Sequence, residues 1–186
     1  MVSIPSLWLP ILLSAVLVFV VSSVIHMVIP LHRNDISKLP SEDEVMDALR
    51  KFDIPPGDYM IPCSGGPEAM RQPAFLEKMK KGPVAWMTIV KSGPPQMGPS
   101  LAQWFVYSLV IGVFAAYVAG RALGPGARYL QVFRFSGVTA FVGYSLALWQ
   151  DSIWYRRRWS TTFKYTVDGF VYCLVTAAIF GWLWPK

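Results

Sequence analysis

The sequence predicts an all-α integral membrane protein, with four transmembrane helices and a small α+β or irregular extramembrane insert between the first and second helices. Hydrophobic residues make up 54% of the 186 residues and charged residues only 15%. The apolar residues form four long blocks, and 11 of the 15 prolines lie between the first two blocks. Because soluble domains usually contain about 25% charged residues, this composition excludes a disordered chain, a disulfide scaffold and a typical soluble enzyme.

Each of the four blocks is long enough to cross a bilayer. A hydrocarbon core about 30 Å thick requires about 20 apolar helical residues, and irregular backbone cannot face lipid. The first block has no Lys or Arg before it and is longer than the apolar core of a signal peptide, so we interpret it as a retained anchor. The predicted spans are Leu7–Ile29, Leu101–Ala122, Phe135–Trp154 and Thr166–Trp184.

Three regions follow from these spans: a first transmembrane helix in residues 1–29, an extramembrane insert in residues 30–100 and a three-helix transmembrane region in residues 101–186. The insert contains nine Lys or Arg and nine Asp or Glu, so the net charge of +6 comes from the rest of the chain. A helix is expected at Ser41–Phe52, with Ser41 and Glu44 as a capping box. A second helix is expected at Pro73–Lys81. Short strands are expected at Tyr59–Pro62 and Val84–Val90.

Basic residues near the span ends predict the orientation. Seven Lys or Arg flank the ends that adjoin the insert, against four at the ends that adjoin the chain termini. The insert is therefore expected in the cytoplasm and both termini outside it. A short multi-pass chain without sorting signals favours the bacterial cytoplasmic (inner) membrane. Three consecutive arginines next to the third span are expected to contact anionic lipid headgroups: Arg156, Arg157 and Arg158.

Polar residues from all four spans fall at one depth, near the insert side. Ionisable groups inside a span are costly and mark candidate sites, so these residues could form a proton-linked or cation-binding layer. The alternative is purely structural, with one aspartate paired with the arginine run and the other paired with Lys164 at i,i+4. The candidate layer consists of His26, Gln103, Asp151 and Asp168.

The sequence predicts no metal site and no cofactor. The two cysteines, Cys63 and Cys173, and the two histidines match no zinc spacing, and a disulfide between a loop cysteine and a mid-span cysteine is not expected. A haem held between spans by two histidines would need a second intramembrane histidine, and His32 lies outside the first span. A pigment held by His26 alone remains an alternative. The chain contains no P-loop, nucleophile elbow, GxGxxG or HExxH motif.

The absence of catalytic motifs favours a non-catalytic accessory or scaffold subunit of a larger membrane complex. Rows of small residues, such as Ala116 with Gly120 and Ala177 with Gly181, would let helices approach closely within the chain or against another subunit. Membrane lipids and other membrane subunits are the expected partners, and nucleic acid is not expected. One alternative is a small oligomeric transporter or ion-conducting protein that uses His26, Asp151 and Asp168. Another is a membrane enzyme that acts on a lipid or quinone.

Overall fold

The computed structural model describes residues 1–186 and divides into two units. The larger unit comprises Met1–Ile36 together with Gln96–Lys186, and the smaller unit comprises Ser37–Pro95. The chain therefore leaves the helical unit after Ile36 and re-enters it at Gln96. The boundaries differ by a few residues from those of the compositional insert, because the proline-containing segments at its two ends belong to the helical unit.

Four helices of the larger unit are long and apolar enough to cross a membrane, which confirms the predicted helical class. A single turn of 3-10 helix, η1 (Ile4–Leu7), leads into the first helix. The third helix continues through the 3-10 turn η3 (Leu146–Leu148) into α7 (Trp149–Trp154). The four principal helices are α1 (Trp8–Met27), α5 (Met97–Ala122), α6 (Tyr129–Ser145) and α8 (Trp159–Trp182).

Three of the helices begin before the predicted apolar spans. The second helix starts at Met97 rather than Leu101, the third at Tyr129 rather than Phe135, and the fourth at Trp159 rather than Thr166. Hydropathy marks only the apolar middle of a helix, whereas backbone hydrogen bonding continues through polar and aromatic residues beyond it. Thr161 and Thr162, in the first turn of α8, precede the predicted apolar span but are both buried.

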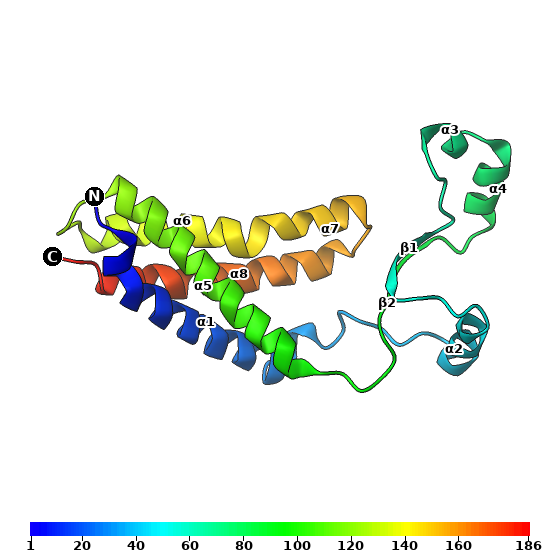
Figure 1. Ribbon diagram of the computed structural model, residues 1–186, viewed down its shortest axis with the longest axis horizontal. Helices are drawn as coiled ribbons and strands as arrows, with labels where there is room; N and C mark the ends of the chain where they lie inside the picture. Colours follow the sequence, from blue (N-terminus) through cyan, green and yellow to red (C-terminus); the bar gives the residue numbers. More distant parts are fainter. The chain divides into compact units, whose positions relative to one another are not determined.

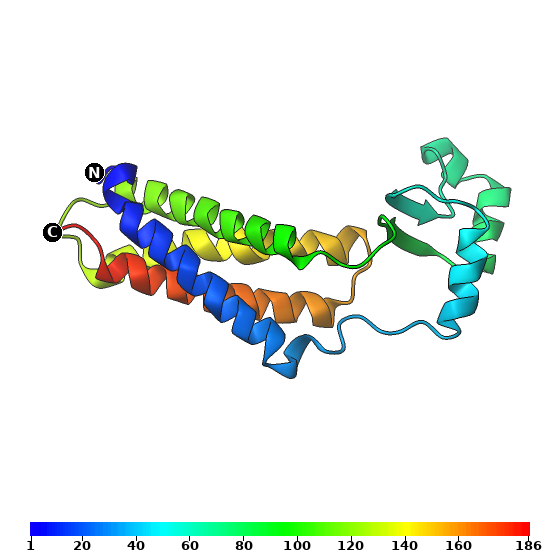
Figure 2. The same cartoon turned by 60° about the horizontal axis from the view of Figure 1, so that its bottom comes forward.

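The four helices form a ring in which each packs against two neighbours. Contacts join α1 to α5, α5 to α6, α6 to α8 and α8 to α1, and Figures 1 and 2 show this antiparallel arrangement. Both chain termini lie at one end, where the Val2 amide donates to the Gly120 carbonyl and the Gly126 amide to the Pro185 carbonyl, each at 2.8 Å. The opposite end, where α1 ends and α5 begins, is called the site end below.

Small residues lie inside the ring, where they let the helices approach one another. Ala116, Gly120 and Ala177 are buried within the chain. A Cβ added at Gly137 of α6 would lie 3.0 Å from the Cβ of Ala177 on α8. Large apolar side chains such as Val20, Phe114 and Val138 instead remain exposed on the outside of the ring.

Gly169 on α8 marks the tightest approach to α6. An added Cβ would collide with the Ser145 hydroxyl and would lie 3.1 Å from the Cβ of Tyr144. A larger residue at this position would therefore force the Ser145 side chain and the neighbouring backbone of α6 to shift. Because Gly169 follows Asp168, the same approach fixes where the Asp168 side chain leaves α8.

We expect Gly169→Ala to destabilise the helical unit, because overpacking of this kind costs about 1–3 kcal/mol. Thermal unfolding in detergent should show a Tm lower by roughly 2–4 °C for each kcal/mol. Gly98→Ala in α5 is the matched control, since an added Cβ there meets nothing within 4 Å. Equal Tm values for both variants would contradict the close α6–α8 approach.

The smaller unit holds three short helices and a two-stranded antiparallel sheet. Strands β1 (Gly57–Ile61) and β2 (Ala85–Ile89) pair with Gly57 opposite Ile89 and Ile61 opposite Ala85. None of its residues is buried, so the unit has no hydrophobic core of its own. Its helices are α2 (Glu42–Arg50), α3 (Pro67–Met70) and α4 (Pro73–Lys81).

One local prediction for this unit is wrong. Ser41 precedes α2 as expected, but its φ of 49° is left-handed and its side chain makes no capping hydrogen bond. The N-cap bond requires an extended backbone that brings the hydroxyl under the first turn, and the turn after Pro40 does not provide it. By contrast, α4 has the predicted bounds, with proline in its first turn and Gly82 after its end.

Candidate functional site

A turn after α1 brings the two histidines of the chain together. The helix ends at Met27, and Ile29 is extended, as expected for a residue before proline. The 3-10 turn η2 (Pro30–His32) follows. The imidazole ring of His32 stacks parallel to that of His26, with centroids 4.6 Å apart, and both rings lie near Tyr165 of α8.

Asp168 of α8 faces this histidine pair. Its side chain is only 3% exposed, and its Oδ2 lies 2.9 Å from Nε2 of His32. The two atoms are not aligned as a hydrogen bond, and neither has another hydrogen-bond partner. One ligand atom from each of His26, His32 and Asp168 lies within 4.8 Å of the other two. Two imidazoles and a carboxylate thus converge on one point.

The other nitrogen of each imidazole is already engaged by an acceptor. Nδ1 of His26 lies 3.0 Å from the Ser22 carbonyl, and Nδ1 of His32 lies 2.7 Å from Oδ2 of Asp35. A carbonyl oxygen and a carboxylate can only accept, so each Nδ1 carries the hydrogen. In the neutral imidazole this leaves Nε2 with a free lone pair, which is the tautomer of a metal-ligating histidine with an outer-shell partner.

Asp35 is itself held in place by Lys164. The lysine Nζ donates to Oδ1 of Asp35 at 2.7 Å and to the Leu31 carbonyl at 2.8 Å. Burial of Asp35 opposes its ionisation, but hydrogen bonds from Lys164 and His32 outweigh it, and the pKa of Asp35 falls below its usual value. Asp35 is therefore a carboxylate at neutral pH, and it fixes the orientation of the His32 ring.

A cavity of about 440 Å³ adjoins the convergence point. His26 and Asp168 form part of its wall, and residues of α1, α5, α6 and α8 contribute the remainder. The wall is mostly apolar and rich in aromatic rings. Five aromatic side chains line it: Trp104, Tyr107, Tyr144, Tyr165 and Tyr172.

The structure divides the predicted polar layer into two parts. His26 and Asp168 meet at the site, whereas Gln103 is exposed and does not line the cavity. Oδ2 of Asp151 lies 3.6 Å from Nη1 of Arg157, with both side chains about 40% exposed. Asp151 therefore pairs with the arginine run, as the purely structural alternative predicts. Asp168 does not, because its proposed partner Lys164 contacts Asp35 instead.

His32 is the site residue that sequence reasoning missed. It lies beyond the apolar span, so it was placed outside the candidate layer. The sequence signal that indicates it is Pro30, which follows the end of α1 and begins a turn. His32 lies two residues after Pro30, and Asp35 lies three residues after His32. Both cysteines are free, as expected, and neither belongs to the site.

Only one residue of the arginine run contacts the site region. The Arg157 guanidinium lies 4.9 Å from the centroid of the Tyr165 ring, on which it stacks. Tyr165 in turn lies beside both histidines. Arg156 and Arg158 are exposed.

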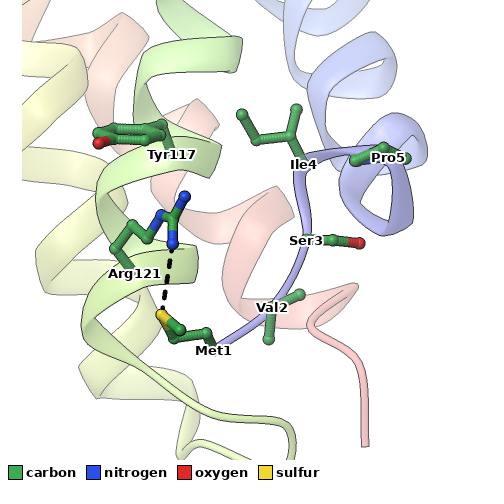
Figure 3. Close-up of a pocket in the computed structure, with 7 residues that line it drawn as sticks. All are labelled: Met1, Val2, Ser3, Ile4, Pro5, Tyr117 and Arg121. Atoms are coloured by element: carbon green, nitrogen blue, oxygen red, sulfur yellow. Dashed lines mark hydrogen bonds between the residues drawn. The ribbon is translucent and has the colours of Figure 1, made fainter.

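A second cavity, of about 340 Å³, lies at the other end of the ring and has a different character. Figure 3 shows residues 1–5 facing Tyr117 and Arg121 of α5, with the Arg121 guanidinium 3.5 Å from the sulfur of Met1. No histidine, cysteine or carboxylate lines it. It therefore offers no comparable set of ligands.

Comparison with protein-family models, with curated proteins and with solved structures finds no match. The class that the fold defines is a four-helix protein with helices apolar enough to span a membrane and a histidine–carboxylate cluster at one end.

We expect Asp35→Ala to destabilise the site end of the ring. The change removes the acceptor of Nδ1 of His32 and leaves Lys164 with the Leu31 carbonyl alone, and an unsatisfied buried polar group costs about 1–3 kcal/mol. Thermal unfolding of the purified protein measures this loss. Glu77→Ala, which removes an exposed carboxylate of α4, should leave Tm unchanged; a similar fall in both variants would contradict the structural role of Asp35.

Proposed function

We propose that this chain is an integral membrane protein that binds a divalent transition-metal ion of the Zn²⁺ type through His26, His32 and Asp168. The observation that carries the proposal is the convergence of three ligand atoms: Oδ2 of the buried Asp168 lies 2.9 Å from Nε2 of His32, neither atom makes a hydrogen bond to any other group, and His26 lies beside them. A cation between these atoms would satisfy all three groups at once.

The ligand chemistry fits such an ion. Imidazole nitrogens suit Zn²⁺, Cu²⁺, Ni²⁺ and Fe²⁺, whereas Mg²⁺ and Ca²⁺ prefer oxygen ligands. With Zn–N and Zn–O distances of about 2.0–2.2 Å, tetrahedral ligand atoms lie about 3.4 Å apart. The more widely separated ligand atoms would therefore draw together, and Nε2 of His32 and Oδ2 of Asp168, now 2.9 Å apart, would separate slightly. Three protein ligands leave a fourth position open, an arrangement typical of metal sites that also bind a small molecule.

The outer shell supports the same proposal. The second nitrogen of a metal-bound imidazole usually donates to a carboxylate or a carbonyl oxygen, which orients the ring. Asp35 accepts from His32 in this way, and the Ser22 carbonyl accepts from His26. The proposed function thus departs from the expectation of no metal site, which considered spacing along the chain alone. It follows the cation-binding alternative, with His32 taking the place of Asp151.

Membrane insertion is supported by the four apolar helices and by the large aliphatic side chains on the outside of the ring. The basic bias of seven against four supports an orientation with the insert and the site end towards the cytoplasm. A bacterial inner membrane is the setting we propose for this arrangement. Arg156 and Arg158, exposed beside α8, would contact lipid headgroups there.

A role as an accessory subunit is a second candidate, favoured by one observation. The smaller unit buries none of its residues and exposes Met46, Leu49 and Phe52 on and just after α2. Such a surface suits docking to another membrane subunit. This role would be compatible with a metal site, and recovery of a single stoichiometric partner from the native membrane in mild detergent would support it.

Metal binding is tested on the full chain in detergent, in a Cys63→Ser background that removes the exposed thiol. We expect one Zn²⁺ per chain by isothermal titration and elemental analysis. Asp168→Asn and His32→Ala should each weaken binding at least tenfold, because each removes a ligand. Asp151→Asn is the matched control, since it changes an aspartate that faces Arg157 instead.

Two results would contradict the proposal. One is the absence of Zn²⁺ binding to a protein that remains folded and monodisperse. The other is binding that Asp168→Asn and Asp151→Asn affect equally, which would place the ion elsewhere.

The orientation is tested by cysteine labelling in a Cys63→Ser, Cys173→Ser background. An impermeant thiol reagent added to intact cells should label Gly124→Cys, in the turn between α5 and α6, and should not label Ser41→Cys in the insert. The reverse pattern would place the insert outside the cytoplasm. Labelling of both positions after membrane disruption controls for accessibility.

A further inference from the structure

The cavity beside the histidine–carboxylate cluster has a buried polar group that no protein atom satisfies. Tyr172 lines this cavity, and its hydroxyl is buried and has no hydrogen-bond partner. A buried unpaired hydroxyl is unfavourable, and a phenol donates readily to an oxygen acceptor. The cavity therefore suits a ligand with an acceptor oxygen near Tyr172.

The aromatic rings around the cavity indicate the shape of such a ligand. Trp104 lies with its ring centroid 5.6–6.0 Å from those of Tyr107, Tyr144 and Tyr172. The Trp104 indole nitrogen is held by the Ser22 hydroxyl at 2.8 Å, which fixes the orientation of the ring. Fixed aromatic faces favour a flat ring, which can stack on them or meet them edge to face.

The remaining wall is apolar and carries no cationic side chain. Besides Ser22 and Ser23, it consists of Met27, Met97, Leu101 and Leu148, and no Lys or Arg is among the lining residues. A phospholipid phosphate would find no positive partner there, whereas an apolar tail would pack well. The volume of about 440 Å³ lies within the range of small-molecule pockets, about 300–1,000 Å³.

We propose that this cavity binds a membrane-soluble quinone, with its ring against the cavity-facing surface of Trp104, Tyr107 and Tyr144 and one carbonyl oxygen accepting a hydrogen bond from Tyr172. This proposal names a ligand for the same site, and it rests on the proposed metal binding only for the coupling between the ion and the quinone. Because His26 and Asp168 also line the cavity, an ion held by them would lie at the wall of the same cavity as the quinone. Zn²⁺ and quinone should then strengthen each other's binding.

Binding is measured on the full chain in detergent with decylubiquinone as the probe, using quenching of tryptophan fluorescence and isothermal titration. We expect saturable binding of one quinone per chain. Leu148→Trp, which fills the cavity, should abolish it, and Tyr172→Phe should weaken it about tenfold. Tyr117→Phe, at the other cavity, is the matched control and should leave binding unchanged. Saturating Zn²⁺ should tighten quinone binding at least threefold.

The two proposals fail in distinguishable ways. Quinone binding that Leu148→Trp abolishes in a protein that binds no Zn²⁺ would support the cavity assignment and overturn the metal function. Zn²⁺ binding with no saturable quinone binding, or with quinone binding unaffected by Leu148→Trp and Tyr172→Phe, would overturn the quinone proposal alone. Equal competition by decanol, which has the tail but no ring, would also overturn it by identifying a site for an acyl chain.

Discussion

The carboxylate of Asp168 is the constraint on which the site end of this protein depends. A side chain that is only 3% exposed cannot rely on water for its charge. Its partner comes from outside the four helices, because η2, which follows α1, places His32 against it. The same turn aligns His32 with His26 and brings Asp35 to Lys164 on α8. Removing any member of this chain of contacts would leave another buried polar group unpaired.

Helix packing and site geometry are coupled through α8. The close approach of α8 to α6 at Gly169 sets the position of the neighbouring Asp168, and small residues allow such close packing beside larger buried side chains such as Phe180 and Val18. Farther along α8, Tyr172 projects into the aromatic cavity. One helix therefore contributes the carboxylate, the lysine that anchors the outer shell and the free hydroxyl. The other three helices supply the second imidazole and the apolar walls.

Periodicity and composition were sufficient to predict the four long helices, because each of them needs a long apolar segment. They also predicted α4, whose ends are set by a local proline and a local glycine. The interruption of the third helix at Leu146–Leu148 was not predictable in this way, because hydropathy does not report a change in hydrogen-bond pattern. The capping box at Ser41 failed for a similar reason, since its residue types were right but its backbone conformation was not.

The sequence predicted only part of the site, because the depth of a residue along a helix and the direction in which its side chain points are separate properties. Asp151 and Asp168 were placed at the same depth, yet one turns out to Arg157 and the other turns inward to His32. His32 could not be placed from hydropathy, since its position depends on the turn at Pro30 rather than on the helix. A histidine just beyond a helix-ending proline is the pattern that would have indicated it.

The central claim is that two imidazoles and one carboxylate hold a metal ion at this point, and X-ray absorption at the zinc edge tests it most directly. The Zn²⁺-loaded protein should show only nitrogen and oxygen scatterers at about 2.0–2.2 Å, with the multiple-scattering signature of two imidazoles. In the Asp168→Asn variant this spectrum should change, whereas in Asp151→Asn it should not. A sulfur scatterer at about 2.3 Å, or a spectrum without imidazole, would show that the ion binds elsewhere and would contradict the account.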